Sequence, residues 1–251
     1  MNFNVVVYSH IDYSDVLKIQ TDYVSGFQNK FLLIDEKFND EEILSKYDQI
    51  VRYDDNLPYS DRLLNLMKIN CEYILFIHDI DILIDYSLDF LESCVSKMKE
   101  KNIHRVDLQY YPKNNETKVT KLNHQDNVIE LIKQENLNQF IYNVNPSIWK
   151  LDVFMNIMNK FKNRTYRDIE SMDVQEYSSQ FNICKLHSEN YLQVGYYNCI
   201  NEFIFLHISH NSMFLPKENN DLSDNIQKIY HSIIEKYLIN SNKNFRTVKH
   251  G

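Results

Sequence analysis

The chain has 251 residues, of which 43% are hydrophobic and 25% are charged. This length and mixture suit one globular domain with a sizeable core. The formal net charge of −8 argues against a general nucleic-acid binder, which is usually basic. The four cysteines include no close pair, so we expect reduced thiols and neither a disulfide framework nor a zinc site at Cys71, Cys94, Cys184 and Cys199.

We expect neither a signal peptide nor a transmembrane segment. The apolar residues near the start, 3–8, are too few for either and are followed by His10 and Asp12. A cytoplasmic location is therefore expected, and any contact with a membrane would be peripheral.

Short apolar segments and amphipathic segments alternate over residues 1–85. The segments rich in β-forming residues predict strands at 4–8, 30–34, 49–53 and 73–77. The segments between them predict helices at 14–23, 40–47 and 61–70, with Ser14 as a helix cap and an apolar stripe of Leu63, Leu64, Met67 and Cys71. This alternation predicts an α/β fold in which a mixed, mostly parallel sheet is flanked by helices.

The rest of the chain is less regular. Helices are predicted at 87–101 with Ser87 as the N-cap, at 165–181 and at 221–238, and the segment 147–161 is predicted as a turn that leads into a helix. Strands are predicted at 105–111, 140–144 and 202–208, and a polar loop or hairpin at 114–127. The last helix is expected to bury Ile226, Ile229, Tyr230, Ile233 and Tyr237, and the tail beyond it to be frayed.

Two carboxylates, Asp79 and Asp81, follow the uncharged segment 73–77. That segment predicts a strand buried in a parallel sheet, and α/β proteins bind ligands at the carboxyl edge of such a sheet. Carboxylates are costly to bury unpaired, and two hard oxygen ligands suit Mg²⁺ or Mn²⁺ that carries a diphosphate. The pattern therefore indicates a metal and phosphate site. The alternative is that both residues cap the next turn.

A metal-dependent phosphohydrolase is one alternative function for this motif. Haloacid-dehalogenase-like phosphatases also place Asp-x-Asp after an apolar strand, but after the first strand and with Thr or Val two residues further on. Here Leu83 holds that position and three predicted strands precede the motif. The phosphatase pattern therefore fits poorly.

The order of these segments resembles that of the GT-A glycosyltransferases, which bind nucleotide-sugars. The resemblance rests on Tyr8-Ser9-His10 after the first strand, on Asp35 and Asp54-Asp55 after the next two, and on the segment 53–64 before the Asp-x-Asp strand. It implies nucleotide or diphosphate contacts at Tyr8, His10, Asp35, Asp55, Arg62 and Asp79. The alternative for Arg62 is a surface arginine paired with Asp61 or Asp55.

Downstream, the string Asn145-Pro146-Ser147-Ile148-Trp149-Lys150 resembles the segment that opens the acceptor half of several small GT-A families. It implies that a sugar ring stacks on Trp149, with a core residue as the alternative. The resemblance also implies a carboxylate that removes the proton of the acceptor hydroxyl, first of all Glu170, then Asp173 or Glu176. On one helix Glu170 and Asp173 would share a face. The alternative for each is a solvated acidic face.

The string from Phe205 to Asn211 resembles the late GT-A segment whose histidine completes the metal coordination. His207 or His210 is implied as that ligand, since a neutral imidazole fits beside carboxylate and diphosphate oxygens. Their odd spacing places them on opposite faces of a continuous strand, so at most one would coordinate the metal. The alternative is an ordinary polar strand end. We expect His78 to be packed beside the aspartates.

The resemblance implies one GT-A domain over residues 1–251, with a nucleotide-sugar half at 1–110, an acceptor half at 111–240 and a flexible tail at 241–251. It implies metal-dependent transfer, with inversion, of a sugar from a nucleoside diphosphate sugar, first of all a UDP-sugar. The alternative to inversion is a retaining enzyme, which would have no dedicated base. The acceptor would be a hydroxyl of a glycan, a lipid-linked molecule or a protein, and Asp79 and Asp81 would hold Mn²⁺ or Mg²⁺. The chain departs from the family in having only 3 glycines, so a flexible Gly-rich lid is not expected. A catalytically silent member that binds a glycan or a protein is the second alternative.

Overall fold

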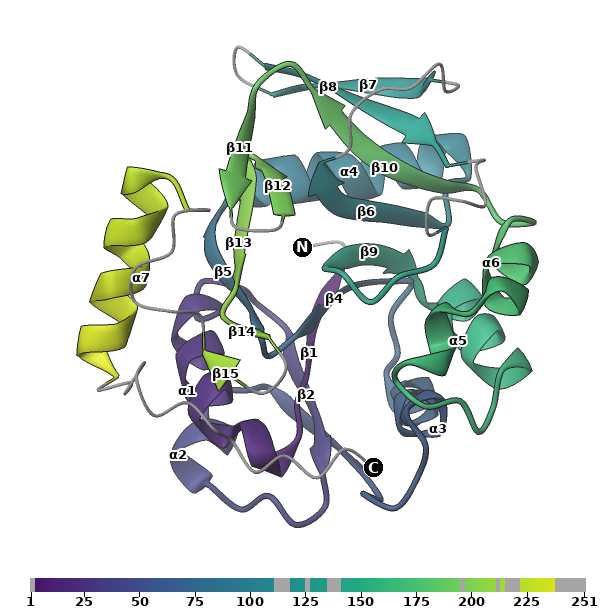
Figure 1. Cartoon of the computed structure of the whole chain (residues 1–251). Coiled ribbons are helices and arrows are strands. Elements are labelled where there is room, and N and C mark those ends of the chain that lie inside the picture. The colour runs from purple at the N-terminus through teal and green to yellow at the C-terminus, as the bar shows by residue number, and fades with distance from the viewer. Residues whose placement is uncertain are drawn as a thin grey trace.

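The computed structural model describes residues 3–110, 118–124, 127–134, 141–194, 197–210, 213–214 and 222–237. Its centre is a nine-stranded sheet in the order β3-β2-β1-β4-β9-β6-β10-β8-β7 (Figure 1). The strands of this sheet are β1 (Asn4–Tyr8), β2 (Lys30–Asp35), β3 (Gln49–Tyr53), β4 (Tyr73–His78), β6 (Arg105–Tyr110), β7 (Lys118–His124), β8 (Asn127–Lys133), β9 (Ser147–Lys150) and β10 (Ile183–Ser188).

Most of these strands run in one direction. Strands β3, β2, β1 and β4 are parallel neighbours, and so are β6 and β10. Strand β9 runs antiparallel between β4 and β6, and β8 runs antiparallel between β10 and β7. The predicted mixed, mostly parallel sheet flanked by helices is thus confirmed.

Helices cover both faces of the sheet. They are α1 (Ser14–Tyr23), α2 (Glu41–Leu44), α3 (Tyr59–Leu63), α4 (Leu88–Lys101), α5 (Leu151–Lys160), α6 (Met172–Ser178) and α7 (Asp224–Lys236), with 3₁₀ turns η1 (Ile11–Tyr13), η2 (Leu64–Lys68) and η3 (Asp168–Glu170). Alternate residues of β1 and β4 enter different cores, because successive side chains of a strand point to opposite faces. One core contains side chains of α1, α4 and α7, and the other those of α3, α5 and α6.

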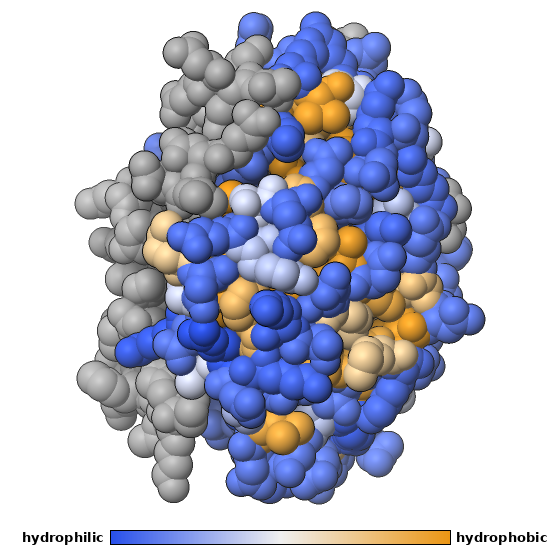
Figure 2. All heavy atoms as spheres, turned by 90° about the vertical axis from the view of Figure 1, so that its right-hand side faces the viewer, coloured by the Kyte–Doolittle hydropathy of each residue, from blue (hydrophilic) through white to orange (hydrophobic). Residues whose placement is uncertain are grey.

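Figure 2 shows the face of the molecule that carries α3, α5 and α6. Polar side chains dominate there, and apolar ones appear only in small separated groups. The apolar sides of these helices are buried in the core beneath.

A second, antiparallel sheet starts at the Asp-x-Asp motif. It has the order β11-β12-β13-β5 and contains β5 (Asp81–Tyr86), β11 (Tyr191–Val194), β12 (Tyr197–Ile200) and β13 (Phe203–His207). The sequence did not predict β5. A further pair, β14 (Ser209–His210) and β15 (Met213–Phe214), follows β13. The second aspartate is therefore the first residue of a strand, which holds its backbone in place.

Several predicted helices differ from those observed, and residues 147–150, predicted as the turn before a helix, form strand β9. Helix α1 begins at Ser14, but Ser14 does not cap it; instead His10 caps η1 by accepting a hydrogen bond from the backbone N–H of Asp12. The predicted helix 61–70 is α3 followed by η2, and the tighter 3₁₀ turn leaves Met67 on the surface instead of in the apolar stripe. The predicted helix 165–181 is interrupted at Ser171, whose backbone is extended.

The structure also tests one predicted loop or hairpin and one predicted strand. The predicted loop or hairpin at 114–127 is a hairpin where it is described, formed by β7 and β8. The predicted strand 140–144 is wrong over its described residues, 141–144, which form bends. Residue 140 and the tail from 238 lie outside the described residues.

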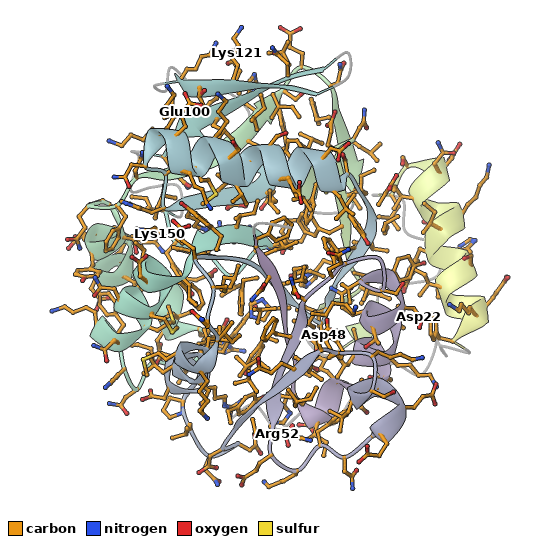
Figure 3. The ribbon with its side chains drawn as sticks, turned by 180° about the vertical axis from the view of Figure 1, so that it is seen from behind. Asp22, Asp48, Arg52, Glu100, Lys121 and Lys150 are labelled. Carbon is orange, nitrogen blue, oxygen red and sulfur yellow. The ribbon has the colours of Figure 1, made fainter. Side chains whose placement is uncertain are left out.

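Helix α7 is fastened to α1 by polar contacts. Figure 3 labels Asp22 on α1, at the side of the molecule where α7 lies. The Lys236 ammonium donates to Asp22 at 2.8 Å, and the Tyr237 hydroxyl donates to the same carboxylate. Within the described ranges, none of the helices combines the length and the apolar character that crossing a bilayer requires. The four cysteines are free thiols, as expected.

Ser87 is the N-cap of α4, and its hydroxyl accepts a hydrogen bond from the backbone N–H of Phe90 at 3.2 Å. We predict that Ser87→Ala lowers the free energy of unfolding by about 1 kcal/mol, because the amide loses its partner. Urea unfolding would measure this. Ser96→Ala, an exposed position inside the same helix, is the matched control and should not destabilise. Equal effects of the two variants would contradict the capping role.

Candidate active site

The order of the strands in the sheet changes direction at β1. The chain passes from β1 to β2 and β3 on one side and returns to β4 on the other. The carboxyl ends of β1 and β4 therefore flank a topological switch point, where open α/β sheets bind ligands. Tyr8 and His78 are paired at this point, and the backbone N–H of Asp79 donates to the carbonyl of Tyr8 at 3.0 Å. The Asp-x-Asp motif begins here.

Asp79 and Asp81 are each only 5% exposed, and both carboxylates have partners. The Ser9 hydroxyl, from the loop after β1, donates to Oδ2 of Asp79. The Nδ1–H of His207, at the end of β13, donates to Oδ1 of Asp81 at 2.8 Å. These bonds satisfy the desolvated oxygens. Sequence reasoning missed Ser9 as a partner, although it lies within the Tyr8-Ser9-His10 string.

Gln20, buried on α1, fixes the backbone at the start of β5. Its side-chain amide donates to the Asp81 carbonyl at 3.0 Å and accepts from the Leu83 N–H at 3.2 Å. A glutamine used in this way continues the hydrogen-bonding pattern of a strand. Asp81 is thus held from α1, β5 and β13 at once.

The donor set fits a hard divalent cation. Mg²⁺ in proteins is often held by one or two carboxylates, with substrate phosphates and water completing the shell. Among the described residues, no three histidine, cysteine or acidic side chains are grouped closely enough to hold a metal by themselves. Asp79 and Asp81 could therefore hold Mg²⁺ or Mn²⁺ together with a phosphate ligand.

The two histidines predicted as metal ligands are placed differently. His207 forms a register pair with Asp81 across β5 and β13, so its ring orients that carboxylate. His210 lies in β14, a separate strand, so the two do not share one continuous strand as the prediction supposed. The side chain of His210 is outside the described part of the chain.

Arg62 and Asp55 form a polar cluster at the carboxyl ends of β1 and β3. The Arg62 guanidinium donates to the carbonyls of Leu57 and Asp55, each at 2.7 Å, and to the Tyr8 hydroxyl at 3.4 Å. Its Nη2 also lies 3.6 Å from Oδ1 of Asp55, so the pairing with Asp55 weighed from the sequence is present. The Tyr8 ring stacks on Tyr53 at 5.7 Å.

His10 and Lys37 also contact Asp55. The Nε2–H of His10 donates to Oδ1 of Asp55, and Nζ of Lys37 lies 3.4 Å from Oδ2. Burial alone would raise the pKa of Asp55. The hydrogen bond from His10 and the charge of Arg62 outweigh burial and lower that pKa below its usual range. Three cationic or ionisable groups thus surround one carboxylate on this side of the motif.

Asp35 is fully buried at the end of β2. Its carboxylate accepts hydrogen bonds from the backbone N–H of Ile11 at 2.7 Å and of Lys37 at 3.0 Å. Asp35 therefore shapes the loop that carries His10. A nucleotide contact at Asp35 stays a prediction.

His78 is the packed histidine expected from the sequence, with an exposed fraction of 3%. The Nδ1–H of its ring donates to the Val144 carbonyl at 2.9 Å, and the Tyr59 hydroxyl donates to Nε2 at 2.7 Å. A carbonyl can only accept, so these two bonds fix one neutral tautomer. Burial, opposed by Asp81, lowers the pKa of His78 to about 4.

Glu170 differs from the other two predicted carboxylates. It is partly buried at the end of η3, and its Oε1 accepts from the Val144 N–H at 2.9 Å. Burial raises the pKa of Glu170, and the Val144 amide and Arg105 oppose that rise. Asp173 and Glu176 are exposed on α6, and Asp173 pairs with Arg164. The prediction that Glu170 and Asp173 share a helix face is wrong, because the extended Ser171 separates their elements.

Tyr166 and Tyr197 lie near both Asp81 and Glu170. Tyr166 contacts the rings of Tyr59 and His78 edge to face, with centroids 5.2 and 5.7 Å away, yet it is 43% exposed. Burial raises the pKa of Tyr197, and Asp81 and Glu170 are among the charges that act on the hydroxyls of both tyrosines. Both tyrosines are therefore near both carboxylates.

No sequence signal singled out Tyr166 or Tyr197. Tyr166 stands in a turn before η3, and Tyr197 begins β12. Each reaches the aspartates only through the packing of elements distant along the chain. An isolated tyrosine has no pattern in a sequence that contains 18 of them.

Trp149 belongs to the core, the alternative considered for it. It is 1% exposed, and the Arg105 guanidinium lies 4.8 Å from its ring centroid. Arg105 is itself fully buried and donates to the carbonyls of Ile141 and Asn143 at 2.8 and 3.2 Å. Asn143 in turn donates to the buried Asp107 at 2.6 Å. This network holds the bends 141–144 beside Glu170.

No protein-family model and no curated protein matches the sequence. Among solved structures, S. aureus TarS 1–349 is similar at 12% identity. The match covers 74% of this chain and 60% of that chain, with a TM-score of 0.43. A cytidylyltransferase from Leptospira borgpetersenii is similar at 12% identity over 100% of both chains, with a TM-score of 0.47. A UDP-glucose pyrophosphorylase complexed with UDP-glucose is similar at 11% identity, 76% of this chain, 93% of that chain and a TM-score of 0.42.

The chain spans less than two thirds of TarS 1–349, and 36% of the longer TarS structure. Such low identities and TM-scores do not indicate a shared activity.

The buried His78 makes the stability of the protein depend on pH. Its pKa is about 4 in the fold and about 6.5 in an unfolded chain, so the unfolded state binds more protons between these values. The free energy of unfolding should fall as the pH drops from 6.5 to 4, by about 3 kcal/mol from this residue. Urea unfolding of wild type and His78→Asn across that range would measure the difference. The same slope in both proteins would contradict the prediction.

Proposed function

We propose that this protein is a metal-dependent glycosyltransferase of GT-A type, which moves a sugar from a nucleoside diphosphate sugar to an acceptor hydroxyl. The observation that carries the proposal is the buried pair Asp79 and Asp81 at the switch point between β1 and β4. Tyr8 is paired with His78 beside the motif and accepts a hydrogen bond from Arg62, and Tyr166 lies near both the aspartates and Glu170. We place a phosphate ligand at Arg62 and the acceptor at Tyr166 and Glu170.

The donor half of the proposal rests on charge. Asp79 and Asp81 would hold Mn²⁺ or Mg²⁺, which when bound neutralises charge on the diphosphate leaving group. Arg62 would supply a guanidinium to a phosphate oxygen, since its fork matches that geometry. Tyr8 and His10 would line the nucleotide side, together with Asp55. The nucleotide-sugar half would be residues 1–110, and a uridine nucleotide is the first to test.

The acceptor half of the proposal rests on Glu170. Its pKa is raised by burial, which makes the carboxylate a stronger base. No described residue donates a hydrogen bond to its Oε2, so that oxygen can take the proton of an acceptor hydroxyl. Direct attack by that hydroxyl would invert the anomeric carbon. We prefer Glu170 to Asp173 because Asp173 is exposed and paired with Arg164.

Tyr166 is the aromatic surface we propose for the acceptor, in place of the buried Trp149. Its half-exposed ring stands against His78 and is near Glu170. A sugar ring packs well on such an aromatic face. This favours a glycan acceptor over a lipid-linked or protein hydroxyl.

We predict that Mn²⁺ together with one nucleoside diphosphate raises the melting temperature of the protein. Ligand at about 100 times its dissociation constant stabilises the fold by about 2.7 kcal/mol, or several degrees for a chain of this size. Chelation of the metal should abolish the shift. Asp79→Asn with Asp81→Asn should do the same, while Asp85→Asn, an exposed aspartate on β5, should not.

Activity and binding assays on the same protein distinguish the alternative functions. Release of phosphate from simple esters without nucleotide would identify a phosphohydrolase. Formation of a nucleotide-sugar from a nucleoside triphosphate and a sugar phosphate would identify nucleotidyl transfer instead. Binding of a glycan without turnover, and without an effect of the aspartates, would identify a catalytically silent protein.

We predict that Glu170→Gln lowers kcat for sugar transfer about 10²- to 10⁴-fold, the usual contribution of a general base. Nucleotide binding should be retained, because Glu170 lies on the acceptor side. The raised pKa means that wild-type activity should fall with decreasing pH at a higher pH than for an ordinary glutamate. Asp173→Asn is the control and should stay active. Undiminished transfer by Glu170→Gln would remove it from this role.

A further inference from the structure

The two sides of the candidate site are connected through one residue, Val144. We propose that His78 acts as a positioning residue that orients the Glu170 carboxylate through the backbone of Val144. This inference rests on the proposed function for the role of Glu170. It adds that the strand carrying the Asp-x-Asp motif also sets the geometry of the base.

The first link is the bond between Val144 and Glu170. The Val144 N–H donates to Oε1 of Glu170 at 2.9 Å. This bond holds one carboxylate oxygen and so fixes the direction in which Oε2 points. It also favours the ionised form of a group whose burial favours the neutral form.

The second link is the bond between His78 and Val144. The Nδ1–H of His78 donates to the Val144 carbonyl at 2.9 Å. The ring is held by the Tyr59 hydroxyl at Nε2 and packs edge to face on Phe76 and Tyr8, with centroids 5.2 and 5.4 Å away. His78 is the last residue of the fully buried strand β4. The donor is therefore placed by a fully buried strand of the central sheet.

The segment around Val144 needs these bonds because it belongs to no strand. In place of a ladder, side chains satisfy its backbone: Gln175 bonds both the N–H and the carbonyl of Tyr142, each at 2.8 Å. Gln175 also donates to the carbonyl of Glu170 at 3.0 Å. Val144 is the point where the carboxylate of Glu170 and the ring of His78 act on the same residue. Loss of the His78 donor would free the Val144 carbonyl and let the amide turn away from Glu170.

Two variants at one position separate the hydrogen bond from packing. His78→Phe keeps an aromatic ring and removes the donor, whereas His78→Asn keeps a donor near the place of Nδ1 and removes the ring. We expect His78→Phe to lower kcat between about 10- and 100-fold, the range for a small misplacement of a reacting group, with unchanged KM for the donor. His78→Asn should recover most of this loss. A loss in both variants alike would show a packing role and overturn the proposal.

A double-mutant cycle tests whether His78 acts through Glu170. In the Glu170→Gln background, His78→Phe should lower the remaining kcat by less than twofold, because the group it positions is already disabled. Full additivity of the two losses would overturn the proposal.

Amide hydrogen exchange at Val144 tests the same link without any turnover. His78→Phe should speed exchange at Val144, and His78→Asn and Tyr59→Phe should speed it less. If the variants change Val144 exchange in this order but the wild-type protein has no transferase activity, the proposed function is wrong and the contact between His78 and Val144 still stands. Active protein in which Val144 exchange is the same in all variants would overturn the positioning role alone.

Discussion

Two carboxylates, Asp79 and Asp81, are buried just after β4, and the segments around them are arranged to pair with them. A carboxylate removed from water is stable only where other groups pair with it. Asp79 takes a hydroxyl from the loop after β1, and Asp81 takes an imidazole N–H from the end of β13. The second sheet begins at Asp81 itself and brings His207 into register with it. The loop after β1 and the late strand are thus held where this pair needs partners.

A second constraint lies on the other side of the site. The bends 141–144 are irregular backbone beside the core, and their polar groups must be satisfied without a sheet. Buried side chains do this: Arg105 and Gln175 bind the backbone carbonyls, and His78 and Glu170 bind Val144. These bonds pair the carbonyls of Ile141, Tyr142 and Val144, whereas Nε of Arg105 has no partner among the described residues. A carboxylate held by such a loop keeps its orientation, which suits a base.

The charged and aromatic residues of the site form two groups. Arg62, His10 and Lys37 surround Asp55 near the ends of β1 and β3. Tyr166, Tyr197 and Glu170 form the second group, in which burial raises the pKa values of Tyr197 and Glu170. Arg62 and Lys37 supply the positive charge that an anionic donor would need, and the second group fits a neutral hydroxyl acceptor. Both of these cationic side chains come from the first 62 positions of the chain.

The sequence by itself determined the alternation of strands and helices up to β4, the buried strand at Tyr73–His78 and the two aspartates at its end. These features follow from local composition and period, since apolar runs and amphipathic stripes decide which segments are buried. It also placed Arg62, Glu170 and His207 on a short list of candidates. It ranked Glu170 before Asp173 only through the family resemblance, because the difference in their burial depends on a break at Ser171 that only packing imposes. Only the tertiary structure decided that Trp149 is core, that Ser9 and Tyr166 lie by the aspartates, and that Val144 joins His78 to Glu170. Each of these depends on contacts between residues far apart in the chain, and such contacts leave no period or motif in the sequence.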